Sequence, residues 1–141
     1  MPGPRRKARI AALQALYEVD STGHDAQATV RRLVAELELP SEVGDFASSI
    51  VAGVMQNKGK IDDIVGRFAT AWPLEQLPVV DRNILRLAIF EFFIDNRVSA
   101  KIAINEAVEL AKTFGSEGSH KFVNGVLGSI NTHLRQAQEE R

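Results

Sequence analysis

The sequence predicts an all-helical protein. Apolar residues recur at helical spacing along the chain, as in the series Val30, Leu33, Val34 and Leu37. No run alternates polar with β-branched residues, so strands are not expected. With 141 residues and 45% apolar content, the chain is long enough for one compact domain with a sizeable core. We expect about seven helices in a single domain, residues 1–141, whose seam separates subdomains of about 1–72 and 73–141.

Proline and glycine divide the first half of the chain. Pro4 suits the first helical position, and Gly23 follows the end of the first helix. Pro40 stops the second helix, and Ser41 is a suitable N-cap for the third. The expected helices are about 4–20, 25–39, 41 to a break at 57–59, and 60–71.

The second half has its own stop signals. Pro73 and Pro78 bracket a single helical turn in the seam, residues 72–78. Gly115 suits the position after a helix end, and Ser116 suits the next N-cap. The expected elements are a turn at 74–77 and helices at about 79–95, 100–114 and 117–134. The helix at 79–95 is apolar almost all round, which is typical of a helix at the centre of a fold.

Composition and motifs argue against several classes of protein. The chain has no cysteine, which excludes disulfides, thiolate metal sites and cysteine nucleophiles. It lacks a glycine-rich phosphate loop, a His-Glu-x-x-His motif and a nucleophile elbow. No apolar stretch approaches the roughly 20 residues of a membrane span, and no apolar segment follows the basic N-terminus. We expect no catalytic residue, no metal, no cofactor and a cytoplasmic location.

The N-terminus concentrates positive charge. Residues 1–17 hold four cations and no acid, whereas the rest of the chain holds 13 cations and 18 acids. The cations are Arg5, Arg6, Lys7 and Arg9, which fall in the first turns of the predicted helix. A helix dipole disfavours cations there, so phosphate binding would explain them. The alternative, which the pattern leaves open, is a solvated basic tail.

Two further features suit RNA. Tyr17 lies on the same helix, where it could stack on an unpaired base or fill part of the core. Residues 114–121 combine glycines, serines and a lysine around a helix start, and such a terminus can hold a phosphate. The residues of interest there are Phe114, Gly118, Ser119 and Lys121. An ordinary turn between helices is the alternative.

The central helix carries charges whose roles are expected to be structural. We expect Arg86 to form a structural ion pair with Asp81, Glu91 or Glu106. The neighbouring Asp62 and Asp63 are interpreted as a solvated helix face. Three polar residues near the seam suit a protein interface: Glu75, Gln76 and Asp81.

Three segments together resemble the NusB family of bacterial transcription antitermination factors. They are Arg-Arg-Lys-Ala-Arg followed by Ala-Leu-Gln-Ala-Leu-Tyr (Arg5–Tyr17), Leu-Pro-Val-Val-Asp-Arg-Asn (Leu77–Asn83, continuing to Glu91), and Ala-Ile-Asn-Glu-Ala-Val-Glu-Leu-Ala-Lys-Thr-Phe-Gly (Ala103–Gly115, continuing to Leu127). The third is the most specific. The resemblance implies two perpendicular three-helix subdomains sharing one core, and no enzymatic activity.

The same resemblance implies a function. Family members bind boxA RNA of nascent ribosomal RNA transcripts together with NusE, a small-subunit ribosomal protein, and join other Nus factors on RNA polymerase. By position, the RNA-binding residues would be Arg5, Arg6, Lys7, Arg9, Tyr17, Phe114, Gly118, Ser119 and Lys121. The NusE face would include Glu75, Gln76 and Asp81. Many members have an acid where this chain has Gly118, so we expect RNA affinity no weaker than is typical of the family.

Two alternatives come from other classes. NusB-like domains are also fused to ribosomal RNA cytosine methyltransferases, but that activity needs a methyl-donor domain downstream of Arg141. The other alternative is a helical homodimeric interaction protein without specific RNA binding, since some members of the family self-associate. It predicts that replacing Arg5, Arg6 and Arg9 leaves every binding activity intact.

Overall fold

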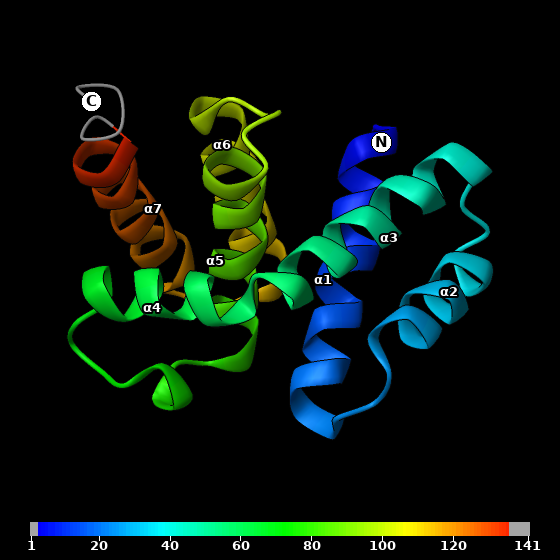
Figure 1. The fold of residues 1–141 in the computed structure, drawn as a ribbon, viewed down its shortest axis with the longest axis horizontal. Coiled ribbons are helices and arrows are strands. Elements are labelled where there is room, and N and C mark those ends of the chain that lie inside the picture. Colours follow the sequence, from blue (N-terminus) through cyan, green and yellow to red (C-terminus); the bar gives the residue numbers. More distant parts are fainter. Residues whose placement is uncertain (1–2, 136–141) are drawn as a thin grey trace. The chain divides into compact units, whose positions relative to one another are not determined.

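The structure, a computed structural model, describes residues 3–135. Within that range the chain forms seven α-helices and no strand, which confirms the predicted all-helical class (Figure 1). A 3₁₀ turn (Leu74–Gln76) precedes α5, and π-helical turns extend α5 (Phe90–Ile94) and α7 (Asn131–Arg135). The helices are α1 (Pro4–Thr22), α2 (Ala26–Glu36), α3 (Ser41–Gln56), α4 (Lys58–Phe68), α5 (Val79–Ile89), α6 (Ala100–Phe114) and α7 (Ser119–Ile130).

The helices group into two compact units, residues 1–56 and 57–141. In the first unit, α1, α2 and α3 pack against one another. In the second, α4 packs against α5 and α7 through its buried apolar residues Ile61, Ile64 and Val65. The division therefore falls earlier in the chain than the seam expected at residues 72–78, because α4 belongs with the helices that follow it.

Small residues set the packing of the first unit. The buried face of α1 is rich in alanine, with Ala8, Ala11 and Ala12 fully buried, so its backbone can approach its neighbours closely. Gly44 on α3 serves the same purpose, because a Cβ there would lie 2.7 Å from a methyl carbon of Val34 on α2.

The second helix ends three residues before its expected end at Leu39. Glu38 adopts a left-handed backbone conformation with φ of 53°, and the Leu39 N–H donates to the Val34 carbonyl. This arrangement closes a helix C-terminus even without glycine. Pro40 then precedes α3, whose first helical residue is Ser41, so Ser41 is not the N-cap.

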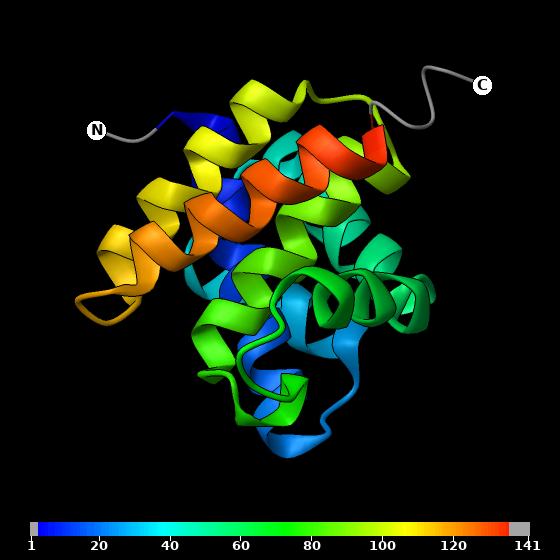
Figure 2. The ribbon, with the colours of Figure 1, turned by 90° about the vertical axis from the view of Figure 1, so that its left-hand side faces the viewer.

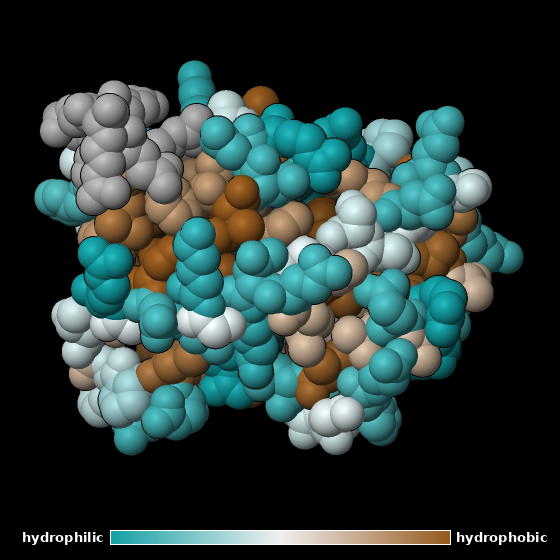
Figure 3. Space-filling view, in the orientation of Figure 1, coloured by the Kyte–Doolittle hydropathy of each residue, from teal (hydrophilic) through white to brown (hydrophobic). Residues whose placement is uncertain are grey.

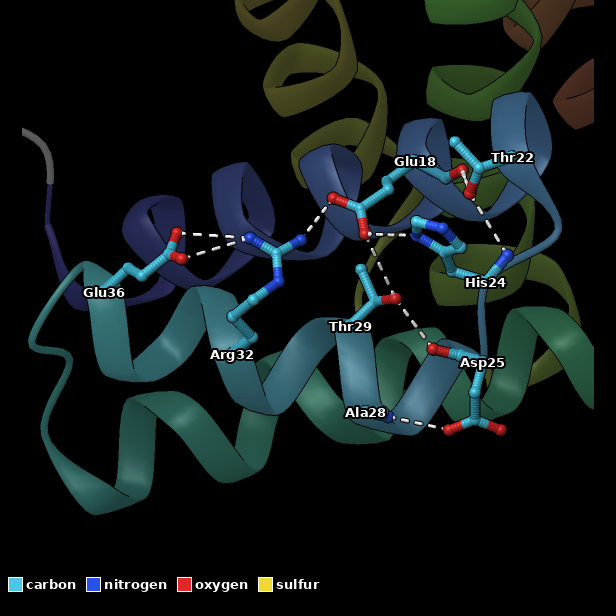
Figure 4. Close-up of polar contacts among 8 residues, drawn as sticks. All are labelled: Glu18, Thr22, His24, Asp25, Ala28, Thr29, Arg32 and Glu36. Atoms are coloured by element: carbon cyan, nitrogen blue, oxygen red, sulfur yellow. Dashed lines mark hydrogen bonds and ion pairs between the residues drawn. The ribbon is translucent and has the colours of Figure 1, made fainter.

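A polar network joins the end of α1 to α2 (Figure 4). The Glu18 carboxylate contacts His24 Nδ1 at 3.0 Å and forms an ion pair with Arg32. The hydrogen bond with His24 contributes most, and that with Arg32 comes second. Together they hold the pKa of the Glu18 carboxyl below its usual value. Asp25 caps α2 by accepting the Ala28 N–H at 2.8 Å. The network therefore fixes the connection between the two helices.

Replacing Glu18 with Gln should make stability less dependent on pH. Because the folded-state pKa lies below the ordinary value of 4.5, the ionised carboxylate stabilises the folded state above that pH. The contribution is lost as the pH falls through the lowered pKa. Urea unfolding of both proteins should show a midpoint difference at pH 7 that shrinks on acidification. Asp45→Asn, an exposed change in the same unit, is the control; a Glu18→Gln difference that grows on acidification would contradict this account.

The second unit is built around α5. Its residues Ile84, Leu85 and Leu87 are almost completely buried, as expected for a central helix. The helices α6 and α7 lie side by side and are joined by a short turn (Figure 2). Ser99 caps α6 by accepting the Ile102 N–H at 3.2 Å.

A buried ion pair connects α5 to α4. Arg86 donates from Nε and Nη2 to the two carboxylate oxygens of Asp62, at 2.8 and 3.1 Å. A third bond runs from Arg86 Nη1 to Asn83 Oδ1 at 3.0 Å. The structural role expected for Arg86 is present, but the interpretation of Asp62 as a solvated surface acid is wrong. Sequence spacing does not show that α4 folds back onto α5.

The surface is mixed in character. On the face shown in Figure 3, hydrophilic side chains lie among apolar ones. In the part of the chain that the structure describes, no helix is both long and apolar enough to cross a membrane.

Candidate nucleic-acid interface

The first two turns of α1 expose three cations. The helix starts with Pro4 in its first turn, and its N-cap residue Gly3 offers no side chain to the free N–H groups. Arg5, Arg6 and Lys7 are exposed, and no acid lies in this turn. The positive end of the helix dipole adds to their charge, so this end of α1 attracts anions.

Arg9 has a different environment from these three residues. It is only 4% exposed, and its guanidinium carbon lies 5.7 Å from the centre of the Phe46 ring on α3. The guanidinium carbon of Arg5 lies 4.8 Å from the same ring centre. Phe46 therefore contacts both arginines through cation–π interactions. Sequence spacing does not indicate this contact, which joins α1 to α3.

Two shallow hollows flank the basic turns of α1. One, of about 310 Å³, is bordered by Arg5 together with Glu42, Val43 and Phe46 of α3. The other, of about 290 Å³, is bordered by Lys7 and Ile10 and by residues 37–40 between α2 and α3. Both are at the lower limit of size for an enclosed ligand site. The basic surface is therefore open and suited to an extended ligand.

Tyr17 lies farther along α1. Its side chain is 45% exposed, which favours the stacking interpretation over the core interpretation. Lys7, Gln14 and Tyr17 are spaced by seven and three residues, so they share one face of the helix. That face presents a cation at one end and an aromatic ring at the other.

The turn between α6 and α7 holds the other group of predicted RNA-binding residues, all in the second unit. Gly118 and Lys121 are exposed, and Phe114 is half-buried. Ser119 is only 1% exposed, and its hydroxyl donates to Asp81 Oδ1 at 2.7 Å. That hydroxyl also accepts the Ser116 N–H at 2.9 Å. The Ser119 side chain thus holds the turn together and does not face solvent.

The start of α7 differs from the sequence expectation. The helix begins at Ser119 with Gly118 at the N-cap, rather than at Glu117 after a Ser116 cap. The Ser119 N–H donates to the Ser116 carbonyl, which closes a separate turn before the helix. Gly115 is in an extended conformation, not the left-handed one expected after a helix end. It is needed for space, since a Cβ there would lie 2.5 Å from that of Ser119.

Gly115→Ala should therefore destabilise the protein. The new methyl group would also lie 2.8 Å from the Ala111 carbonyl oxygen, so backbone must move. We expect the free energy of unfolding to fall by about 1–3 kcal/mol, as for other overpacked sites. Gly118→Ala is the matched control, because no atom lies within 4 Å of a Cβ placed there. Urea denaturation measures both; equal stability of the two variants would rule out the crowding explanation.

The residues expected to bind a protein partner divide into two environments. Glu75 and Gln76 are exposed in the 3₁₀ turn. Asp81 is 5% exposed, in the first turn of α5, and accepts the Ser119 hydroxyl. Trp72, an exposed aromatic that sequence reasoning did not single out, lies two residues before the 3₁₀ turn. The sequence does hold a signal for Trp72, because it directly precedes Pro73 in the seam and a segment between two prolines tends to lie at the surface.

Among residues 3–135, no group of three or more His, Asp or Glu side chains is placed to hold a metal ion. Exposed cations at the start of one helix suit phosphate contacts, and an exposed tyrosine farther along it suits stacking on a base. These features favour the class of nucleic-acid-binding proteins.

Comparison with known proteins identifies the family. The sequence profile of the NusB family matches residues 6–132. The transcription antitermination protein NusB of Dehalococcoides mccartyi (strain 195) is 46% identical over 141 residues, covering 100% of this chain and 99% of that protein. The chain belongs to the NusB family, and the relatives that match it over its full length are transcription antitermination proteins.

Solved structures agree with this assignment. T. maritima NusB superposes with a TM-score of 0.87 at 33% identity, covering 99% of both chains. A chain from a crystal structure of antitermination factors NusB and NusE in complex with dsRNA superposes with a TM-score of 0.85 at 27% identity, covering 94% of this chain and 98% of that one. The NusB fold thus occurs in complexes with RNA.

Proposed function

We propose that this protein binds boxA-type RNA of nascent ribosomal RNA transcripts together with NusE, and joins the RNA polymerase antitermination complex with other Nus factors in the cytoplasm. The observation that carries the proposal is the exposed group Arg5, Arg6 and Lys7 at the positive end of α1. A sequence selected for helix stability alone would place acids at these positions. A related NusB crystallised with NusE and dsRNA supports the same assignment.

The residues have distinct roles in this proposal. The three exposed cations of α1 contact phosphates, and Tyr17 stacks on an unpaired base. In the second unit, Lys121 adds a phosphate contact, and the exposed backbone at Gly118 allows close approach of the RNA. Phe114 is half-buried beside that turn, so part of the residue is accessible to RNA. Arg9 and Ser119 act through other residues: Arg9 packs on Phe46, and Ser119 holds the turn.

The residues of the NusE face also divide into exposed residues that would contact the partner and a buried residue that supports them. Glu75 and Gln76 are exposed and would contact NusE directly. Asp81 is buried and one of its carboxylate oxygens accepts the Ser119 hydroxyl, so Asp81 would shape this face rather than contact NusE. Trp72 is a further anchor for NusE, because exposed tryptophans often dominate protein interfaces.

A binding titration tests the proposal. Fluorescence anisotropy would follow a labelled boxA-like RNA, and a scrambled RNA of the same length, with and without NusE at several KCl concentrations. We expect selective binding that NusE strengthens. Three cations on α1 and Lys121 give a log–log salt slope of about −2 to −3, at roughly −0.7 per phosphate contact.

Absence of selectivity under every condition would overturn the proposal. The basic end of α1 would then be a solvated surface. A helical homodimeric interaction protein would become the better interpretation, and sedimentation velocity of the same sample would test it.

A further inference from the structure

Two adjacent residues in the first turn of α5 hold the two binding segments of the second unit. Asp81 accepts the Ser119 hydroxyl at 2.7 Å, which ties α5 to the turn before α7. Arg82 Nη1 donates to the Glu75 carbonyl oxygen at 3.3 Å, which ties the same helical turn to the 3₁₀ turn. The first turn of α5 is therefore bonded to the segment proposed to bind NusE and to the turn proposed to bind RNA.

The contact between Asp81 and Ser119 is shielded from solvent. Both residues are buried, so water does not readily replace either partner. The Ser119 hydroxyl donates its hydrogen bond to the Asp81 carboxylate. A lone pair of the same oxygen therefore remains to accept the Ser116 N–H. The position of Asp81 thus fixes the orientation of the hydroxyl, and the hydroxyl fixes the backbone of the turn.

The surroundings of the turn make this contact sensitive to small movements. Gly115 packs so closely on Ser119 that no Cβ fits between them. Ser116 Oγ lies 3.2 Å from Ser119 Oγ, so three polar groups depend on one hydroxyl. Tightly packed contacts of this kind change between discrete arrangements rather than deforming gradually.

We propose that the first turn of α5 couples the two binding events. When NusE docks on the exposed 3₁₀ turn, the bond from Arg82 restrains the first turn of α5, and Asp81 then holds Ser119 and the RNA-binding turn in one arrangement. RNA meets a turn that is already ordered, so it loses less conformational freedom on binding. This inference rests on the proposed function and adds a means by which NusE strengthens RNA binding. The coupling is reciprocal, so RNA strengthens NusE binding by the same factor.

The test measures the ratio of RNA affinities with and without NusE. Ser119→Ala removes the hydroxyl and with it the contacts to Asp81, to the Ser116 N–H and to the Ser116 hydroxyl. Ser119→Cys keeps the shape of the side chain but is a weaker donor. Asp81→Asn keeps an acceptor oxygen for the hydroxyl. Ser129→Ala, the same substitution farther along α7, is the matched control.

For the natural sequence we expect NusE to tighten boxA RNA binding about tenfold, within the usual range of about 5- to 150-fold for coupled sites. Ser119→Ala should reduce this ratio to about twofold or less, with Ser119→Cys intermediate. Asp81→Asn and Ser129→Ala should keep most of it. The affinity for NusE with and without RNA should change by the same ratios in every variant.

An unchanged ratio in Ser119→Ala would overturn the inference. If the RNA affinities themselves are also unchanged, NusE acts by adding its own contacts to the RNA. If RNA affinity falls equally with and without NusE, Ser119 has a structural role only. Should Ser119→Ala fail to fold, Ser119→Cys decides by the same criteria. If the natural sequence shows no selective RNA binding at all, the proposed function fails, and the coupling fails with it.

Discussion

Replacing Arg5, Arg6 and Lys7 together with glutamine is expected to weaken boxA RNA binding by roughly 10- to 100-fold at physiological salt. Each side chain is exposed at the start of α1 and contributes a phosphate contact in the proposed function. The log–log salt slope should become shallower by about 2, at roughly 0.7 for each phosphate that the variant no longer neutralises. Fold stability should fall only slightly, because the three side chains are exposed and the cation–π contact of Arg5 with Phe46 contributes about 0.5–1 kcal/mol at an exposed site. Anisotropy titrations at several salt concentrations measure both effects.

A matched triple variant separates local contacts from net charge. Arg31, Lys60 and Lys101 are exposed cations on other helices, and their replacement with glutamine removes the same charge. We expect this control to lower RNA affinity by no more than about twofold, through the weak long-range field alone. Equal losses in the two variants would show that RNA responds to overall charge and that α1 has no special role.

The largest effect on stability is expected from Arg86→Ala. The variant removes both bonds to Asp62 and the bond to Asn83, and it leaves a cavity where the buried side chain packed. Asp62 keeps some access to water, so the expected loss is about 3 kcal/mol in the free energy of unfolding, near the lower end for a broken buried pair. Urea denaturation followed by circular dichroism measures it.

Arg97→Ala is the control for that measurement. Arg97 pairs with Asp95 at 2.7 Å, but its side chain is exposed, so no measurable change in the urea midpoint is expected. Similar losses in the two variants would contradict the buried role of Arg86. A loss of less than about 1 kcal/mol for Arg86→Ala would do so as well.

The fold could be predicted from the sequence because its signals are local. Apolar spacing identified every helix, and Pro40 and Pro78 separate helices as expected. Helix boundaries that depend on a side chain from the next turn were harder to predict. Serine is a common N-cap residue, but the N–H of Ser116 donates to the Ser119 hydroxyl. The helix begins at Ser119 instead.

The candidate site could be predicted only where exposure follows from local pattern. Contacts between helices were beyond reach: Asp81 and Ser119 are 38 residues apart, and Arg86 and Asp62 are 24 apart. Helical spacing does place Arg9 on the buried face of α1, since Ala12, Leu13 and Leu16 follow it by three, four and seven residues. The contact of its guanidinium with the Phe46 ring on α3 does not follow from that spacing.

In the proposed function, RNA binds at the exposed cations and Tyr17 of α1 and at the turn between α6 and α7. The most direct measurement is a titration of the ¹⁵N-labelled protein with boxA-like RNA, followed by amide chemical shifts. We predict that shifts concentrate in residues 5–17 and 114–121, and that a scrambled RNA at the same concentration causes smaller shifts there, because its phosphates still attract the cations. Shifts confined to other helices, with these two segments unaffected, would contradict the account.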